Sequence, residues 1–321
     1  MPKNGERSAP SLQLSDLKSL RVFMTVAESS GLSAAQAKLG LSLSHISSIL
    51  NNFEKRFGVK LCERGRSGFS LTEEGNYIYA SSARLLQTLE KFESDLASFR
   101  GVLTGSLSIA AHPGDVTHRE FILPKAINRF LSRENNRANI RLETASQEVI
   151  VNGIVNGTID LAIGFFPNAH VGVVKYKLYE ERSCLYCGAG HPLFARSDEP
   201  RTEEIVAHQF AMRSEIRAPH LPEVLSDVVV RAIASTQEAR VLLILSGKFL
   251  TFVPDHVAAR WVAAGRMRRL GGDQFSYTIE VEMITRDLKN PPALVTAFIQ
   301  DYSAVCLEEA ITVPRLWAGN H

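Results

Sequence analysis

Residues 32–57 read LSAAQAKLGLSLSHISSILNNFEKRF, and this stretch decides the fold of the N-terminal part of the chain. Its second half carries apolar side chains at steps of 3, 4, 3 and 4, the spacing of a helix with one buried face. The apolar stripe consists of Leu43, Ile46, Leu50, Phe53 and Phe57. The other side carries the short polar side chains Ser44, His45, Ser48 and Asn52. Solvated helix faces are usually rich in Lys and Glu, so this face is suited to close approach by another molecule.

A helix-turn-helix is predicted around this stretch. An S-x-x-Q capping pair beginning at Ser33 opens one helix, which ends at Gly40. The helix with the apolar stripe starts at Ser42 or Ser44 and stops at Gly58. Because only about four residues separate the two helices, they must cross at a steep angle.

Two further elements flank this motif. A helix is predicted over 16–29, with Leu17, Leu20, Phe23, Met24 and Ala27 buried. On the other side, VKLCERGRSGFSL (59–71) has two strand-like pieces around a Gly-Arg-Ser-Gly tip, which predicts a hairpin.

A long helix is predicted after Thr72, which is placed to cap it, with Glu73 and Glu74 in its first turn. An apolar row steps along it by 4, 3, 4 and 3, the pattern of a coiled-coil seam, although Ser82 interrupts it one turn earlier. The row consists of Leu85, Leu89, Phe92, Leu96 and Phe99. Self-pairing of two chains is the favoured interpretation, and packing of the helix on its own body is the alternative.

Charge divides the chain of 321 residues unevenly. Residues 1–72 hold ten basic and five acidic side chains, a net charge of +5, which leaves −3 for the remainder because the whole chain carries +2. A small basic module on a mildly acidic body indicates a polyanionic partner at one end only, unless the imbalance arose by chance.

The composition excludes several classes of protein. No apolar run approaches the roughly 18 residues that cross a bilayer, and the N-terminus lacks the apolar middle of a signal peptide. Four cysteines in a chain of this length do not make a disulfide framework. A cytoplasmic protein with no membrane partner is therefore expected.

Beyond Gly105 strands and helices alternate, which predicts doubly wound parallel sheets in two α/β lobes. The first lobe has strands over 106–112, 139–146 and 160–166 and helices over 119–133 and 147–157. The second lobe has strands over 208–214, 228–236 and 249–254 and a helix over 236–248. A cleft is expected where the strand ends of the two lobes face each other.

At this point the chain resembles the LysR-type transcriptional regulators over nearly its whole length. The resemblance rests on LKSLRVFMTVAESSGLSAAQAKLGLS, LNNFEKRFGVKLCERGRSGFSLTEEG, ILPKAINRF, GTIDLAIG and GAGHPLF, in this order and spacing. It implies a winged helix-turn-helix at 15–72, a dimerising linker helix at 73–101 and a two-lobed effector domain at 105–310. That domain is similar to periplasmic binding proteins, with lobe I at about 105–166 plus a C-terminal return and lobe II at about 167–270.

The resemblance also implies partners. Double-stranded operator DNA and a small-molecule effector are expected, in homodimers that pair into homotetramers, and RNA polymerase is a further candidate partner. The family commonly has Gln, then Pro or Ser, where this chain has Leu43 and Ser44, and a frequent Arg is Ser48 here. A base preference typical of the family therefore cannot be carried over.

The short polar face is predicted to read DNA, because it can place donors and acceptors against a major-groove edge. Its members are Ser44, His45, Ser47, Ser48 and Asn51. Ser33 and Ser42 stand at helix starts, where free N–H groups favour a phosphate or simply need a cap. Arg64 and Arg66 lie near the hairpin tip, where they can reach phosphates or a narrow minor groove.

The effector is predicted to bind beyond the carboxyl ends of the strands. The candidate residues are His112, Thr117, Ser146, Gln147, Phe165, Phe166, Met212, Arg213, Ser235 and Thr236. Helices starting after Thr117, Ser146 and Ser235 would direct free N–H groups at an anion, and Arg213 or His112 would add a charge-assisted bond. With Phe165 and Phe166 nearby, or else in the hinge core, a small carboxylic acid with an apolar or aromatic body is expected.

No cofactor or metal is expected. Cys184 and Cys187, with His191 nearby, invite a zinc or redox interpretation, but side chains three apart on a strand point to opposite faces. Buried structural thiols are favoured, and no nucleophile motif or phosphate loop supports an enzyme. Two alternatives stay open: a constitutive architectural DNA-binding protein without effector response, and an enzyme that uses Cys184 or Cys187 as an attachment point.

Overall fold

The computed structural model describes most of the chain as two compact units, residues 1–93 and 94–321. The described residues are 11–65, 68–111, 117–168, 171–213, 225, 228–234, 236–309 and 311. Among them, no helix combines the length and the apolar character needed to span a membrane.

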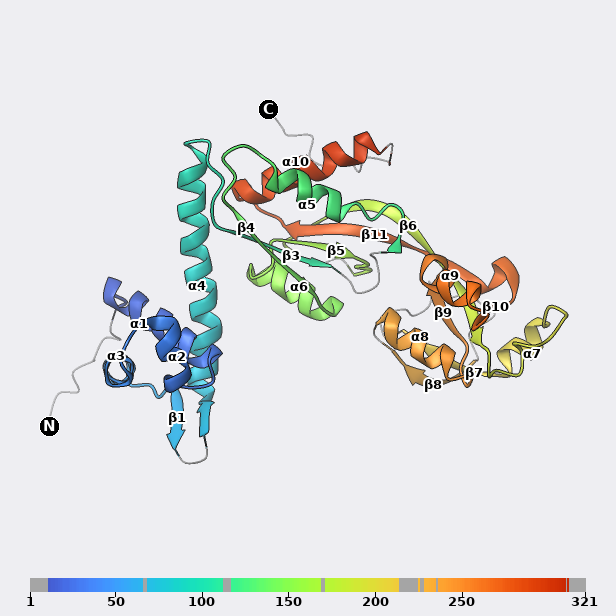
Figure 1. Ribbon diagram of the computed structural model, residues 1–321, viewed down its shortest axis with the longest axis horizontal. Coiled ribbons are helices and arrows are strands. Elements are labelled where there is room, and N and C mark those ends of the chain that lie inside the picture. Colours follow the sequence, from blue (N-terminus) through green and yellow to red (C-terminus); the bar gives the residue numbers. More distant parts are fainter. Residues whose placement is uncertain are drawn as a thin grey trace, which may run out of the picture. The chain divides into compact units, whose positions relative to one another are not determined.

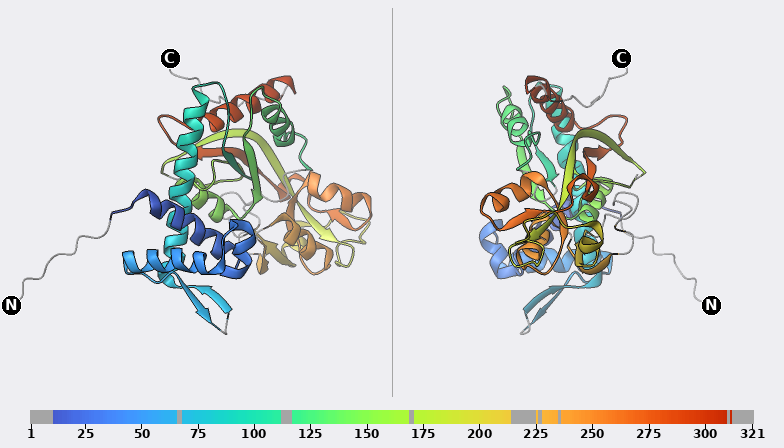
Figure 2. Two further views of the ribbon diagram at one scale, coloured as in Figure 1. Left: turned by 60° about the vertical axis from the view of Figure 1, so that its left-hand side comes forward. Right: turned by 90° about the vertical axis from the view of Figure 1, so that its right-hand side faces the viewer.

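The first unit packs three helices and a hairpin around one apolar core (Figure 2). Its elements are α1 (Leu14–Glu28), α2 (Leu32–Leu39), α3 (Leu43–Phe57), β1 (Cys62–Gly65), β2 (Gly68–Leu71) and the start of α4 (Glu73–Ser98). The two strands are antiparallel and pair from Cys62 with Leu71 to Gly65 with Gly68, which confirms the predicted hairpin. Figure 2 shows this wing projecting away from the three helices.

The capping residues and glycine stops predicted for α2, α3 and α4 are confirmed with one exception. Ser42 caps α3 by accepting a hydrogen bond from the His45 N–H at 3.3 Å, and Thr72 caps α4 by accepting one from the Gly75 N–H at 2.9 Å. Gly40 and Gly58 end α2 and α3 in the left-handed conformation. The capping role predicted for Ser33 is wrong, because α2 begins one residue before it and has Gly31 as its N-cap.

The apolar stripe of α3 is confirmed in its centre and wrong at its start. Ile46, Leu50 and Phe53 are buried and Phe57 is half-buried, whereas Leu43 is 44% exposed. Leu43 is the first residue of α3, and helical side chains lean toward the N-terminus, so its side chain extends past the core. In α1, Val22 and Val26 are buried while Leu17, Met24 and Ala27 are only half-buried.

The residues of the apolar row of α4 become more exposed toward the end of the helix. Leu85 packs against the core of the first unit and Leu89 is half-buried. Phe92 and Leu96 are 60% and 51% exposed, and Phe99 lies past the end of the helix. The row is thus a surface feature from Phe92 onward.

The second unit contains a seven-stranded sheet, which confirms the α/β prediction. The order is β10–β6–β11–β5–β3–β4, and β9 also pairs with β6. The first lobe uses β3 (Ser106–Ala111), β4 (Asn139–Thr144) and β5 (Leu161–Gly164), which are parallel. The long strands β6 (Val173–Gly188) and β11 (Ser276–Arg286) are antiparallel and run from the first lobe into the second (Figure 1).

Helices cover both faces of the first lobe, as Figure 1 shows. On one face α5 (Leu123–Leu131) and α10 (Ala293–Glu308) pack over Ile109 and Ile163. On the other, α6 (Gln147–Asn156) packs over Ala110 and Ala162. This alternation follows from the period of two along a strand. The helix predicted over 119–133 is shorter than expected, because Pro124 stands in its first turn.

The second lobe is built around the far ends of β6 and β11. Its elements are α7 (Thr202–Val206), β7 (Gln209–Met212), β8 (Val229–Ile233), α8 (Gln237–Leu245), β9 (Thr251–Pro254), α9 (Asp255–Ala263), β10 (Met267–Arg269) and the 3-10 helix η3 (Gly272–Phe275). The predicted strands and helix of this lobe are present, and β7 and β8 are parallel. The prediction of a second parallel sheet is wrong for β9, which pairs antiparallel with β6.

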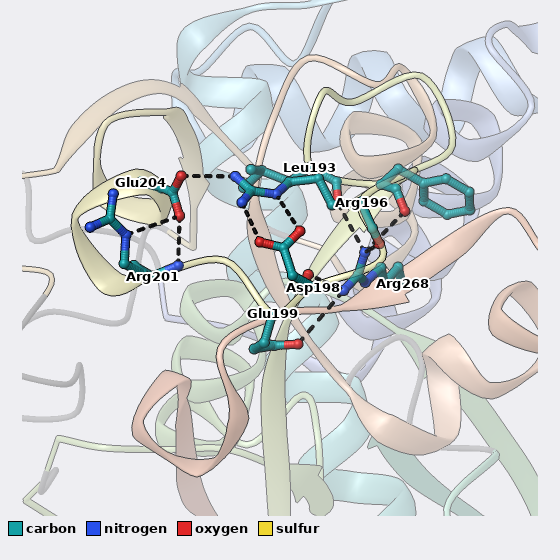
Figure 3. A network of polar contacts seen from close by, with 8 residues as sticks. Leu193, Arg196, Asp198, Glu199, Arg201, Glu204 and Arg268 are labelled. Carbon is teal, nitrogen blue, oxygen red and sulfur yellow. Dashed lines mark hydrogen bonds and ion pairs between the residues drawn. The ribbon is translucent and has the colours of Figure 1, made fainter.

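A polar network fixes the segment between β6 and α7 (Figure 3). The Arg268 guanidinium donates hydrogen bonds to the carbonyl groups of Leu193, Phe194, Arg196 and Asp198. Arg196 in turn pairs with Asp198 and Glu204. The GAGHPLF segment thus has a structural role, since Arg268 satisfies carbonyl groups that no strand or helix pairs.

The close contact between β6 and α8 predicts a difference between two nearby glycines. A Cβ atom on Gly188 would overlap the carbonyl oxygen of Ile244 and lie 2.9 Å from its carbon, whereas one on Gly190 would lie 3.5 Å from Gly247. Gly188→Ala should lower the free energy of unfolding by about 1–3 kcal/mol, and Gly190→Ala by less than about 0.5 kcal/mol. Urea unfolding of the second unit, followed by circular dichroism, measures both. Equal stability of the two variants would contradict this packing.

Candidate functional site

The first candidate site is the polar side of α3. Ser44, His45, Ser48 and Asn51 are exposed and Ser47 is half-buried, so all five predicted residues are accessible within the unit. The hydroxyl groups of Ser42 and Ser44 lie 3.1 Å apart at the start of the helix. Ser33 is exposed in the first turn of α2.

Some of the predicted DNA-reading residues line an open groove, and others lie outside it. Ser33, Ser44 and Ser47 line it, together with Leu43 and the wing residue Phe69. His45, Ser48 and Asn51 are not among its lining residues. Arg64 pairs with Phe69 in the hairpin register, but its side chain, like the whole of Arg66, lies outside the described residues.

The second candidate site lies where the strand ends of the two lobes meet, called here the interlobe region. It is defined by Phe165 after β5, Glu181 on β6, Arg213 after β7, Arg240 on α8 and Tyr277 on β11. The Arg213 guanidinium lies 5.3 Å from the centre of the Phe165 ring, a cation–π contact across the lobes. Both side chains are only 6% exposed.

Two helices start after the carboxyl ends of strands, α6 after β4 and α8 after β8. In such sheets ligands bind at this end of the strands. Ser146 is the N-cap of α6, as predicted, and its hydroxyl makes no capping bond. Thr236 is the N-cap of α8 and accepts a hydrogen bond from the Ala239 N–H at 3.2 Å. The first residues of these helices, Gln147 and Gln237, each bury a side-chain oxygen that has no hydrogen-bond partner among the described residues.

Arg240 is the interlobe residue that sequence reasoning missed. Its side chain is 1% exposed, and its Nη1 donates to the Phe252 carbonyl at 2.8 Å. Its Nε lacks a partner, and no ion pair to it occurs among the described residues. Burial lowers the pKa of this guanidinium, and the nearby Arg213 lowers it further. The signal in the sequence is one basic residue within the otherwise apolar run ARVLLIL (239–245).

A second missed feature connects the lobes by hydrogen bonds. Glu181 is 2% exposed, and its carboxylate lies 2.9 Å from Nε2 of His256 on α9. The other ring nitrogen of His256 lies 2.7 Å from the hydroxyl of Thr117 in the first lobe. With the proton on Nε2, His256 donates to Glu181 and accepts from Thr117.

His118 completes this cluster. Its ring stacks on Tyr179 with centroids 4.3 Å apart and meets His256 edge-on at 5.0 Å. Burial lowers the pKa of His118, and His256 lowers it further. The neutral ring is therefore the favoured form beside Tyr179.

The remaining predicted effector residues have different positions. Phe166 is 1% exposed and belongs to the core under α6, and Met212 is half-buried against the core of the second lobe. The prediction that a helix starts after Thr117 is wrong, because α5 begins at Leu123. His112 and Ser235 lie outside the described residues.

The thiols are structural. Cys184 and Cys187 are fully buried in different core clusters, which confirms that they point to opposite faces of β6. Burial raises the pKa of each to about 11, so neither is a reactive thiolate at neutral pH. Within the described part of the chain, no group of three or more His, Cys, Asp or Glu is arranged to hold a metal.

Comparison with known proteins gives one consistent family. Residues 17–76 match the family model "Bacterial regulatory helix-turn-helix protein, lysR family", and residues 100–306 match "LysR substrate binding domain". The transcriptional activator BauR of Pseudomonas aeruginosa is 33% identical over 291 residues, 89% of this chain and 93% of that protein. The regulator ClcR of Pseudomonas putida is 29% identical and covers 88% of this chain and 96% of its own.

Solved structures share the fold. Full-length CbnR in complex with its target DNA aligns with a TM-score of 0.63 at 21% identity, over 89% of this chain and 98% of CbnR. A full-length OxyR variant from Pseudomonas aeruginosa aligns with a TM-score of 0.59 at 17% identity, over 97% of this chain and 99% of that one.

Proposed function

Because the chain belongs to the LysR family of DNA-binding transcriptional regulators, a family of regulators and not enzymes, we propose that it responds to a small carboxylic acid bound in the interlobe region. Occupancy of that region alters the relative position of the two lobes and, through a homotetramer, the contacts with operator DNA.

The buried Arg240 carries the proposal for the effector. A charge taken out of water costs several kcal/mol unless a counter-charge and hydrogen bonds offset it. Arg240 has the Phe252 carbonyl and the Tyr277 side chain as hydrogen-bond partners, and the guanidinium of Arg213 lies nearby. Among the described residues, the Nε of Arg240 has no hydrogen-bond partner. Glu181 is the acid in the same surroundings, and it is hydrogen-bonded to His256. A bound carboxylate would place a negative charge beside the buried guanidinium of Arg240.

The surroundings of Arg240 favour a carboxylate with an apolar body. The starts of α6 and α8 provide N–H groups that favour an anion, and Ser146 and Thr236 stand at those starts. Phe165 supplies apolar surface beside Arg213.

The DNA site is proposed on the polar side of α3 and its neighbours. Ser44, His45, Ser47, Ser48 and Asn51 would meet base edges, and Ser33, Ser42, Arg64 and Arg66 would meet phosphates or the minor groove. The exposure of the α3 side chains supports this assignment.

A constitutive architectural protein is the alternative function. It binds DNA in the same way and has no effector response. The buried charge of Arg240, which has no ion-pair partner among the described residues, favours the regulator. A buried charge without a counter-charge costs several kcal/mol, and a bound acid would offset part of that cost.

Calorimetry of the intact protein against benzoate, butyrate, glucose and butylamine tests the effector class. An acid should bind, and Arg240→Met should weaken that binding at least about tenfold, as expected when a buried charge-assisted contact is lost. The ligand-free variant should be as stable as the wild type or more stable, since the buried charge is gone. Arg231→Met removes an exposed arginine of β8 and is the matched control. It should change neither the affinity for the acid nor the stability of the ligand-free protein.

Two results would count against the effector proposal. One is selective binding of glucose. The other is acid affinity that is the same in wild type, Arg240→Met and Arg231→Met.

Assembly through α4 is the second part of the proposal. The exposure of Phe92 and Leu96 supports a partner helix over this part of the row. The double variant Phe92→Lys, Leu96→Lys would bury two charges in the seam and should split the dimer. Analytical ultracentrifugation measures the mass of the assembly. The control Tyr77→Lys replaces a 73% exposed ring elsewhere on α4 and should leave the wild-type mass unchanged. A wild-type mass for the double variant would rule out this seam.

A further inference from the structure

Leu43 is an exposed apolar residue at the start of α3. It is 44% exposed, whereas Ile46 and Leu50 on the same helix are fully buried. Leu32, Leu39 and Leu41 pack against the core of the first unit, and Leu43 is not part of that packing. Its side chain therefore contributes little to the stability of the fold.

The groove described above gives Leu43 a defined setting. Ser44 and Ser47 lie beside it on α3, Ser33 faces it from α2, and Phe69 comes from the wing. Leu43, Ser47 and Asn51 are spaced by four residues, so they form one row along the helix. This row combines one apolar side chain with short polar ones.

A base edge in the major groove has the same combination of groups. Thymine is the only base that presents a methyl group there, beside the donors and acceptors of its pair. The first residues of a recognition helix are the ones that reach base edges. We infer that Leu43 contacts the C5-methyl group of a thymine in each half-site, so that this residue selects T at one position. The inference rests on the proposed reading face.

Removing only the methyl group tests this contact. Binding sites are selected from a random duplex library with the intact protein, and each thymine of the consensus is then replaced in turn by deoxyuridine. At one position per half-site, the wild type should bind deoxyuridine about fourfold more weakly, the effect of losing one buried methyl. Leu43→Ala should bind thymine and deoxyuridine there within about twofold of each other, and Leu43→Met should retain the discrimination.

The matched control is Leu14→Ala. Leu14 is also the first residue of its helix and is 87% exposed, but it lies on α1. This variant should keep the wild-type response to deoxyuridine. Far-ultraviolet circular dichroism checks that all variants are folded.

This experiment distinguishes an error in the proposed reading face from an error in the role of Leu43. If the wild type selects no sequence at all, the reading face itself is wrong. If it selects a sequence but Leu43→Ala keeps the wild-type response to deoxyuridine at every position, or the wild type shows no response, then only the role of Leu43 is overturned.

Discussion

The antiparallel pairing of β6 with β11 is the interaction on which the second unit depends. The ladder extends from Val173 paired with Arg286 to Cys184 paired with Ser276. In the first lobe β5 adds to β11, and in the second lobe β9 and β10 add to β6. The register shifts once, between Val281 and Glu282. A bulge of this kind bends a strand, and here the residues on either side of it, Val281 and Met283, both pack in the core of the first lobe.

The polar contacts of the interlobe region lie along this ladder. Two residues of β6 make these contacts. Glu181 is hydrogen-bonded to His256 of the second lobe, and Tyr179 stacks on His118 of the first lobe. The bond from His256 to Thr117 therefore joins the lobes at the ladder itself. A ligand that rearranges Arg213 or Arg240 acts close to the covalent and hydrogen-bonded connections that set the angle between the lobes. Small local shifts become lobe motions in such an arrangement.

Local signals predicted the first unit well and the second unit in part. Ser42 and Thr72 cap their helices through bonds within three residues, so sequence alone suffices to identify them. Periodicity also found the centre of α3, but it could not show where the core ends, and Leu43 was assigned to the interior for that reason. The cap of α2 was missed because Gly31 serves as N-cap without a side chain.

The candidate effector site was harder to predict because it depends on burial. Arg213 and the starts of α6 and α8 follow strand ends and could be inferred from topology. Arg240 and Glu181 stand within a helix and a strand, where charged residues are usually on the surface. Only the packed structure places them at 1% and 2% exposure and near each other. Phe166 was predicted to contact the effector, but its ring lies in the core under α6.

In the proposed function, binding of the acid and binding of DNA are energetically coupled in the intact protein. The most direct measurement is the affinity of the intact protein for a selected DNA site with and without saturating acid, together with the affinity for the acid with and without saturating DNA. Thermodynamic linkage requires the two ratios to be equal. Both ratios should differ from one by the same factor, on the order of five or more. Acid binding that leaves both the DNA affinity and the protected DNA length unchanged would contradict it, and would identify the chain as a constitutive DNA-binding protein.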